Sequence, residues 1–430
     1  MTAQPLLDRP HRVLLGDEAV ALAALDAGVT AAYAYPGTPS TEILEFLLRL
    51  EGEPGAPHAA WCVNEKTALE QALGVSMAGG RSLVAMKHVG LNVAADPFMN
   101  AALVAIRGGL VVAVADDPGM HSSQNEQDSR IYADFAHVPC FDPATLQEAY
   151  DMTREAFEVS ERFHVPVMVR LVTRLAHSRA VLHPAPSEPP RPLSRRADPA
   201  GWVLLPANAR RRWHRLLELQ DELREHGARS AFNRLTLSGE RGGLGVITTG
   251  IARNYLEENL EELAHSPSHL HVGAYPWPVD AIRALADHVD EILVLEEGYS
   301  FLERHLRGLL PGRLPVRGKE SGDLPVDGEL TPDLVRAALG LPARPRLELT
   351  DFPVPARPPQ LCRGCPHQDA FHALRLALEG IEGAVVPSDI GCYTLGLSLR
   401  SRRSTPASAW GPPWAWPRER PTLGCARSWR

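Results

Sequence analysis

Short apolar runs alternate with amphipathic stretches along the first part of the chain. Four apolar runs have the length of buried strands, namely 31–35, 82–86, 110–115 and 165–171. Residues 41–50 and 146–162 show the apolar spacing of helices. Strands separated by helices of this length indicate βαβ units and a parallel sheet that is covered on both faces. The pattern therefore predicts an α/β domain with a doubly wound parallel sheet over residues 12–183.

A second α/β domain is predicted further along the chain. Residues 184–240 combine a proline-rich linker with a strongly charged helix at 210–226. The domain itself is expected over 241–340. Its predicted strands and helices are strands at 244–248, 269–275 and 291–295, and helices at 255–263 and 279–287.

A third unit begins after another proline-rich linker, 341–360. It is predicted over 361–399, with a helix at 368–378 and a strand at 384–386. Residues 400–430 contain four of the chain's eight tryptophans and no valine, isoleucine, phenylalanine or methionine. Such a segment lacks the periodicity of a helix or a strand. We therefore interpret 361–399 as the incomplete start of a domain and 400–430 as an aberrant tail.

Composition and charge narrow the class of protein. With 430 residues, 44% of them hydrophobic, the chain can form two or three packed domains. A net charge of −8 provides no basic field for nucleic acid, so small molecules and other proteins are the expected partners. The longest apolar stretches are far shorter than the ~20 residues of a membrane span, and the N-terminus lacks a secretory core. We expect a cytoplasmic protein without a membrane contact.

Several polar segments of the first domain follow predicted strands. Residues 35–42 run from a strand into a helix, and loops at the carboxyl ends of parallel strands are where such sheets bind ligands. An ordinary helix N-cap at Ser40 or Thr41 accounts for the same residues. Glu65 opens the next helix, where a carboxylate usually compensates the helix dipole. The polar loops 86–92 and 115–126 are compatible both with solvated loops and with a binding site.

Six blocks in order carry a family resemblance. They are YPGTPSTE at 35–42, NEKTALE at 64–70, MKHVGLN at 86–92, DDPGMHSSQNEQD at 116–128, LCRGCPH at 361–367 and DIGCYTLG at 389–396. Over residues 12–396 the chain resembles the α subunit of indolepyruvate:ferredoxin oxidoreductase, a branch of the 2-oxoacid:ferredoxin oxidoreductase superfamily. The blocks ITTGIA at 247–252 and ILVLEEGY at 292–299 are similar to the transketolase C-terminal-like domain of that superfamily.

The resemblance implies a thiamine diphosphate-binding fold and assigns roles in the first domain. That domain corresponds to the pyrimidine-binding one, and Glu65 to the residue that hydrogen-bonds N1′ of the cofactor's aminopyrimidine. This bond favours the imino tautomer that removes the C2 proton. Gly90, Leu91 and Asn92 are expected to line the cofactor or substrate pocket. Thr38 is expected to contact the carboxylate of the substrate.

The resemblance places the diphosphate half of the site in the third unit, contributed by the partner subunit's copy in a homo-oligomer. Its expected entry loop comprises Cys362, Gly364, Cys365 and His367. Its expected second wall comprises Asp389, Gly391 and Cys392. Considered apart from the resemblance, the C-x2-C pair at 362–365 corresponds to half of a zinc or iron-sulfur site. The chain contains six cysteines but no second C-x2-C pair, which argues against a four-thiolate site.

Two parts of the family pattern are not found in the sequence. The Mg2+ ion that holds the diphosphate takes oxygen ligands from a later glycine–aspartate motif, and two [4Fe-4S] clusters lie in a later ferredoxin-like domain. Codons that encode residues 403–417 can be read two bases later to give a sequence that resembles the family's next block. We therefore expect a truncation caused by a frameshift near residues 398–403.

Two functions remain in competition. The first is oxidative decarboxylation of aryl 2-oxoacids, chiefly indolepyruvate, with coenzyme A and ferredoxin as acceptors and with a β subunit as partner. The second is a catalytically inactive fragment that only self-associates or binds the β subunit. A transketolase-like or acetolactate-type enzyme is disfavoured, because those families lack the HSSQNEQD and CRGCPH blocks.

Overall fold

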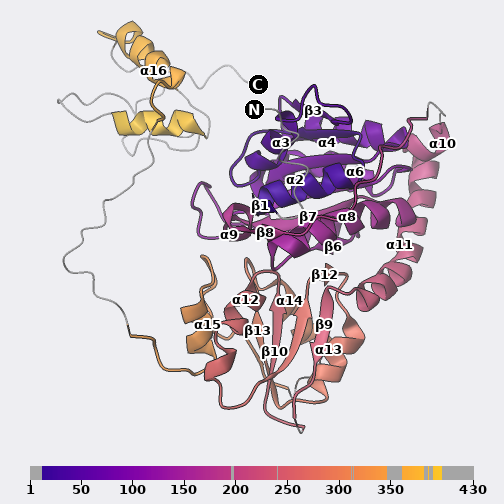
Figure 1. The fold of residues 1–430 in the computed structure, drawn as a ribbon, viewed down its shortest axis with the longest axis vertical. Helices are drawn as coiled ribbons and strands as arrows, with labels where there is room; N and C mark the ends of the chain where they lie inside the picture. Colours follow the sequence, from indigo (N-terminus) through magenta and orange to yellow (C-terminus); the bar gives the residue numbers. More distant parts are fainter. Residues whose placement is uncertain are drawn as a thin grey trace, which may run out of the picture. The chain divides into compact units, whose positions relative to one another are not determined.

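A computed structural model describes most of the chain (Figure 1). The described residues are 12–194, 198–239, 241–310, 312, 314–345, 361–381, 386 and 391–399. The chain divides into two compact units, Met1–Arg344 and Pro345–Arg430.

A seven-stranded sheet forms the centre of the first part of unit one. Its spatial order is β12 (Ala274–Tyr275), β6 (Cys140–Phe141), β7 (Val167–Val172), β5 (Leu110–Asp116), β4 (Ser82–Lys87), β2 (Ala31–Ala34) and β3 (His58–Trp61). All neighbours pair in parallel except β12, which is antiparallel to β6. The predicted parallel sheet is therefore confirmed.

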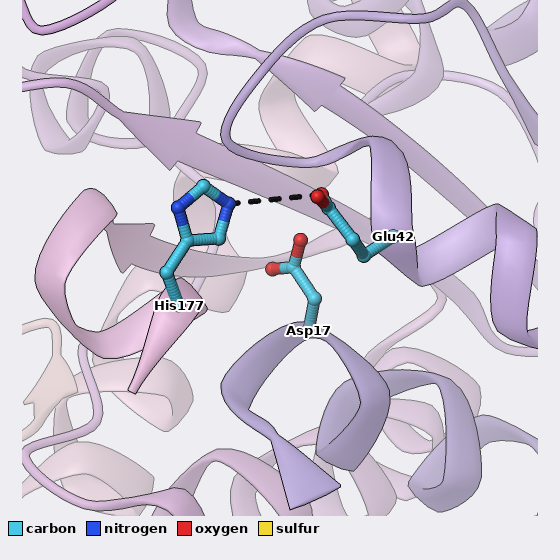
Figure 2. A group of neighbouring side chains, drawn as sticks. All are labelled: Asp17, Glu42 and His177. Atoms are coloured by element: carbon cyan, nitrogen blue, oxygen red, sulfur yellow. Dashed lines mark ion pairs between the residues drawn. The ribbon is translucent and has the colours of Figure 1, made fainter. Parts of the chain in front are cut away.

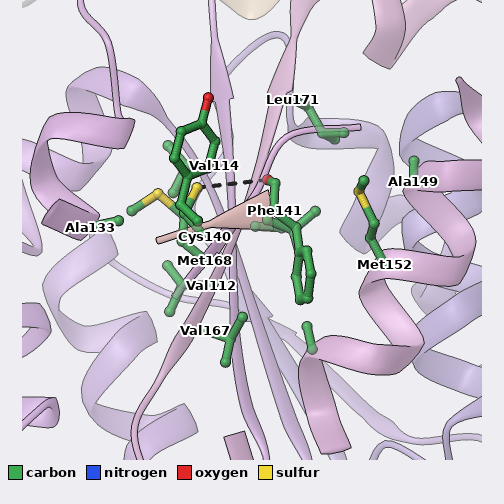
Figure 3. Close-up of a cluster of buried hydrophobic side chains, with 14 of the residues drawn as sticks. Val112, Val114, Ala133, Cys140, Phe141, Ala149, Met152, Val167, Met168 and Leu171 are labelled. Carbon is green, nitrogen blue, oxygen red and sulfur yellow. Dashed lines mark hydrogen bonds between the residues drawn. The ribbon is translucent and has the colours of Figure 1, made fainter. Parts of the chain in front are cut away.

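The central strands of this sheet are apolar because helices cover both faces. Every residue of β4, β5 and β7 is buried, as expected for a parallel sheet. Figure 3 shows Val112 and Val114 of β5 in the sheet, with Ala133 on one side and Met152 on the other. The surrounding helices are α2 (Gly16–Asp26), α3 (Thr41–Leu48), α4 (Glu65–Met77), α5 (His88–Val93), α6 (Ala95–Ala101), α7 (Arg130–Phe135), α8 (Leu146–Phe163) and α9 (Thr173–His177).

Helix α8 illustrates how the sequence determines these elements. Thr145 precedes the helix and its hydroxyl accepts a hydrogen bond from the Glu148 amide at 3.2 Å, which satisfies one free N–H. Apolar residues recur at helical spacing, so one face, which includes the fully buried Phe157, packs against the sheet. His164 ends the helix in a left-handed conformation with φ 59°.

The segment between the two sheets is fixed to the first domain. β1 (Arg12–Leu15) and β8 (Arg179–Leu182) form a separate antiparallel pair. After β8 the Glu188 amide donates to the Asp26 carbonyl at 2.7 Å. The helices α10 (Pro199–Trp202) and α11 (Pro206–Arg229) follow. The helix predicted at 210–226 is thus confirmed and extends by several residues at each end.

A second, five-stranded sheet lies in the same unit. Its order is β14 (Val316–Arg317), β13 (Glu291–Leu295), β10 (Leu244–Thr249), β11 (Ser268–Val272) and β9 (Asn233–Thr236), with only β9 antiparallel. Its helices are α12 (Ala252–Glu257), η1 (Leu260–Glu262), α13 (Val279–Ala286), α14 (Phe301–Leu309) and α15 (Pro332–Ala338).

The prediction of one strand at 269–275 was wrong. The chain leaves the second sheet at Gly273 and joins the first one as β12. The side-chain oxygen of Asn233 accepts hydrogen bonds from the amides of Gly273 and Ala274, at 2.9 and 3.0 Å. The Gly273 amide also donates to the Phe232 carbonyl at 3.2 Å, so the Asn233 side chain supplements the strand pairing at the point where the two sheets become linked.

Unit two is described only in part. It contains α16 (Pro366–Ala377) and η2 (Cys392–Leu399), which contact each other. The helix predicted at 368–378 is confirmed. The strand predicted at 384–386 falls mostly outside the described residues, as does Asp389. No helix among the described residues is long and apolar enough to cross a membrane.

Candidate functional site

The strand order of the first sheet reverses between β2 and β4. The chain passes from β2 outward to β3 and then returns to the other side of β2 to form β4. Loops that follow two such strands diverge at the carboxyl ends, which is where open α/β sheets bind ligands. Residues 35–40 follow β2, and residues 88–93 follow β4. The resemblance had placed candidate residues on both segments.

The turn after β2 is held by its own hydroxyl groups. The Thr41 hydroxyl accepts a hydrogen bond from the Gly37 amide at 3.0 Å, and the Ser40 hydroxyl donates to the Gly37 carbonyl at 2.8 Å. Ser40 precedes α3 but makes no capping hydrogen bond to it. Ser40 therefore does not act as an ordinary N-cap of α3. Thr38, at the tip of the turn, is exposed.

A buried lysine connects this turn with the loop after β5. A Cβ atom on Gly37 would lie 3.2 Å from the Lys87 Cβ atom, so the turn passes close to the end of β4. The Lys87 ammonium donates to the Ser122 carbonyl at 2.7 Å, and the Ser122 hydroxyl donates to the Thr38 carbonyl at 3.2 Å. Burial lowers the pKa of Lys87, although the charge of Asp117 opposes this shift. Three of the predicted loops therefore meet here.

Glu65 lies against Gly90 at the same edge of the sheet. The Glu65 side chain is buried, with 9% of the residue exposed. A Cβ atom on Gly90 would lie 2.5 Å from its Oε1 atom, so any other residue at position 90 would have to displace this carboxyl. Burial raises the pKa of Glu65, and a hydrogen bond from its own backbone opposes the shift. No other residue in the described part of the chain hydrogen-bonds this carboxyl.

The two residues that follow Gly90 point to different surroundings. Leu91 is fully buried. Asn92 is exposed, and its side-chain oxygen accepts a hydrogen bond from the Tyr132 hydroxyl at 2.7 Å. The structure thus brings Glu65 and Gly90 together, whereas Leu91 packs into the core and Asn92 faces the neighbouring helix α7.

Sequence reasoning missed a buried charge network that fixes the loop after β5. Arg130 donates to Asp128 at 2.9 Å and to the Glu297 carbonyl at 3.0 Å. Arg170 donates to Asp116 at 2.7 Å and also to the Glu297 carbonyl, at 3.1 Å. All these side chains are buried. The sequence gives one sign of this network, because charged residues interrupt the ends of otherwise apolar strands. The partners of these residues lie far away in the sequence, so local patterns do not reveal the pairs.

Residues of the second unit form a compact turn before α16. The Cys365 amide donates to the Cys362 carbonyl at 3.1 Å, and Gly364 between them has φ +76°, which favours glycine. The Cys365 sulfur lies 3.2 Å from Nδ1 of His367. The predicted entry loop is therefore one local structure.

The predicted second wall contacts the same helix. The His367 ring packs edge-on against Tyr393, with ring centroids 4.8 Å apart, so η2 lies beside the start of α16. Gly391 and the exposed Cys392 stand just before Tyr393. Among the described residues, Cys362, Cys365 and His367 are not brought close enough together to hold one metal ion.

Comparisons with known proteins find related oxidoreductases for the first domain and also for most of the chain. Residues 22–207 match the family described as "Pyruvate flavodoxin/ferredoxin oxidoreductase, thiamine diP-bdg". The chain is 40% identical over 397 residues to the "Indolepyruvate oxidoreductase subunit IorA" of Methanothermobacter thermautotrophicus, covering 89% of this chain and 64% of that protein. It is 38% identical over 403 residues to the IorA subunit of Archaeoglobus fulgidus, covering 90% and 64%. The chain thus spans less than two thirds of the length of these relatives.

A solved structure has a similar fold. The 2-oxoglutarate:ferredoxin oxidoreductase from Magnetococcus marinus, with 2-oxoglutarate, coenzyme A and succinyl-CoA bound, superimposes with a TM-score of 0.64. The match covers 77% of this chain and 65% of that one, at 16% identity. At this identity the likeness shows the fold alone, and it confirms the predicted fold class.

Proposed function

Because this chain belongs to the family of the indolepyruvate oxidoreductase subunit IorA, we propose that it is the thiamine diphosphate-carrying subunit of a 2-oxoacid:ferredoxin oxidoreductase. The proposed reaction joins an aryl 2-oxoacid, chiefly indolepyruvate, to coenzyme A. Carbon dioxide leaves, and two electrons pass to two oxidised ferredoxins. The β subunit, ferredoxin and a second copy of the chain are the proposed protein partners.

The contact between Glu65 and Gly90 carries this proposal. When bound, thiamine diphosphate supplies the nucleophilic carbon that attacks the 2-oxo group of the substrate. N1′ of its aminopyrimidine needs a carboxyl that shares a proton with it. Glu65 is buried, has a raised pKa and has no partner among the other described residues. Its carboxyl therefore fits this role, and Gly90 leaves room beside it.

The neighbouring turn is proposed to bind the carboxylate of the 2-oxoacid. Thr38 is exposed at the tip of the turn, and the Lys87 ammonium lies behind it at the end of β4. A positive charge near this turn favours an anionic substrate. Leu91 and Asn92 are proposed to shape the same pocket from the segment after β4.

The second unit is proposed to contribute the diphosphate half of the site from the partner's copy of the chain. The proposed residues are Cys362, Gly364, Cys365, His367, Asp389, Gly391 and Cys392. Among the described residues, those around Cys365 form no group of three possible metal ligands and do not provide four thiolates for a [4Fe-4S] cluster. No step of the reaction is therefore assigned to a metal or cluster on these residues.

The Glu65→Gln variant tests the proposal. It is made in a version of the chain extended to the full length of the IorA relatives and assembled with the β subunit. Glutamine keeps the shape of the side chain but cannot share a proton with N1′. We expect the fold to be preserved and exchange of the cofactor's C2 proton, followed by NMR, to slow by about 100-fold or more.

The matched control is Glu70→Gln, on the same helix α4 but exposed. It should leave the exchange rate unchanged. An unchanged rate in Glu65→Gln would contradict the assignment of this residue. Cofactor binding without any turnover in the unmodified assembly would instead support the second function, a subunit that only binds its partners.

A further inference from the structure

Three side chains from three helices converge near the start of α3. They are Asp17 at the start of α2, Glu42 in the first turn of α3 and His177 at the end of α9 (Figure 2). One possible ligand atom from each lies within 4.8 Å of the other two. Nε2 of His177 is 3.7 Å from Oε2 of Glu42. None of the three was singled out by the sequence patterns.

Asp17 lacks hydrogen-bond partners although it is completely buried. Neither of its carboxylate oxygens has a hydrogen-bond partner in the described part of the structure, and the buried Oε2 atom of Glu42 has none either. Figure 2 shows the Asp17 carboxylate directed into the space between Glu42 and His177. Buried charged groups in proteins are normally paired, hydrogen-bonded or bound to a metal ion. Apart from the His177 ring, which is 3.7 Å from Glu42, the two carboxylates have no positively charged partner among the described residues.

The backbone holds these three residues in place independently of their side chains. A Cβ atom on Gly16 would lie 2.2 Å from the Leu175 carbonyl oxygen, so the start of α2 packs directly on α9. The Gly16 amide also donates to the Ser178 carbonyl at 3.2 Å. Glu42 directly follows Thr41, whose hydroxyl holds the turn at Gly37. The arrangement is thus built by packing and is available before any ligand binds.

We propose that Asp17, Glu42 and His177 form a binding site for a divalent transition-metal ion. Two carboxylates and one imidazole are the mixed oxygen and nitrogen ligands that manganese and neighbouring first-row metals accept, whereas Mg2+ and Ca2+ prefer oxygen alone. The side chains of His177 and Glu42 are 36% and 34% exposed, so an ion can enter and keep water ligands on that side. A bound ion would link α2, α3 and α9 close to the turn that precedes α3.

A proton shared between the two carboxyl groups is the competing explanation. Burial and the nearby Glu42 carboxyl raise the pKa of Asp17 well above its ordinary value, which favours such a shared proton when no cation is bound. A metal ion must displace that proton. Direct measurement of metal binding therefore distinguishes the two explanations.

The test uses the complete 430-residue chain after treatment with a chelator, without thiamine diphosphate. Mn2+ is the probe, because it prefers oxygen and imidazole ligands over the thiolates of Cys362 and Cys365. Its free concentration is followed by electron paramagnetic resonance, and thermal unfolding is recorded with and without the ion. We expect about one tightly bound Mn2+ per chain, since there is one such cluster among the described residues, and a higher Tm when Mn2+ is present.

Two variants and a control decide the outcome. Asp17→Asn and His177→Gln should each weaken Mn2+ binding by more than about 10-fold and abolish the increase in Tm. The control is His121→Gln, because His121 forms a similar exposed pair with Glu329, at 3.2 Å, away from the cluster. It should bind Mn2+ like the unmodified chain. The proposal is overturned if the unmodified chain binds no Mn2+, or if binding is unchanged in either Asp17→Asn or His177→Gln.

Discussion

Gly90 shows how a single missing atom can define a site. Its backbone does not require glycine, because its φ is not in the left-handed region, but its position beside the Glu65 carboxyl does. Sequence patterns reveal glycines in turns more readily than glycines that leave space for a neighbour. The resemblance supplied Gly90 and Glu65 as separate candidates, and the structure supplies the reason why they belong together.

Substituting Gly90 should therefore destabilise the fold. In Gly90→Ala the new methyl group must displace Glu65, and overpacking of this kind costs about 1–3 kcal/mol. Gly74 is the matched control, because it lies within α4 with open space around its Cα atom and a helical backbone. Gly74→Ala should stabilise the chain by about 0.5–1 kcal/mol. Urea unfolding of both variants measures the difference, and equal effects would show that Glu65 moves away freely.

Glu297 should make stability depend on pH. This residue is buried, with one carboxyl oxygen that has no hydrogen-bond partner among the described residues, and burial raises its pKa from 4.5 to about 7. The folded chain therefore binds a proton there more tightly than the unfolded chain. Its contribution to stability is fully present below pH 4.5 and is lost as the pH rises through 7.

The Glu297→Gln variant tests this pH dependence. Glutamine cannot ionise, so the variant should lose less stability than the unmodified chain between pH 5 and pH 8. The rise in the pKa of Glu297 from 4.5 to about 7 corresponds to a change in the free energy of unfolding of about 3 kcal/mol at most. Urea unfolding at several pH values gives the slopes, and Glu51→Gln at an exposed position serves as the control. Parallel slopes for Glu297→Gln and the unmodified chain would refute the role of Glu297.

At the scale of elements, apolar runs predicted the strands well and the joints between elements poorly. β5 and β7 are buried on both faces, so nearly every residue is apolar and the run itself identifies the strand. The predicted helix at 255–263 instead breaks into α12 and η1. There the side chain of Asn259 donates to the carbonyls of Tyr255 and Pro332, at 2.8 and 3.0 Å. Such long-range side-chain contacts leave no periodic signal.

The candidate site was predictable to a similar degree. The family blocks identified the loops that meet after β2, β4 and β5. They also identified Glu65 at the start of α4. They did not reveal Arg130, because its partners Glu296 and Glu297 belong to the second α/β domain. A charge that is satisfied only across a domain contact cannot be recognised from local sequence.

Arg130 should therefore be essential for the loop after β5. In Arg130→Met, the buried carboxylates of Asp128 and Glu296 lose a close cation, and breaking a buried pair costs about 3–5 kcal/mol. The exposed pair between Arg224 and Asp221 is the control, since Arg224→Met should cost less than about 1 kcal/mol. Urea unfolding compares the two variants. A cost for Arg130→Met as small as that of the control would mean that the network contributes little.

At the scale of the molecule, two separate features connect the two sheets of unit one. β12 lies between residues of the second domain in sequence but pairs with β6 of the first sheet. The guanidinium groups of Arg130 and Arg170 both bind the Glu297 carbonyl. The candidate cofactor site thus rests on a scaffold that includes both domains. The proposed diphosphate residues lie in the other unit, where α16 has no buried residue.

The cysteines of unit two should not form an iron-sulfur cluster in this chain. A [4Fe-4S] cluster needs four thiolates, and only Cys362 and Cys365 have the required spacing. Cys365 lies beside His367, while Cys392 follows α16 and is exposed. Anaerobic purification followed by iron and sulfide analysis should therefore find far less than one cluster per chain. A version extended to the full length of the IorA relatives is the positive control, because the family resemblance places two clusters in that later part. Stoichiometric iron and sulfide in the 430-residue chain, with a broad absorption band in the visible range that disappears in Cys362→Ser, would show that these cysteines recruit further ligands.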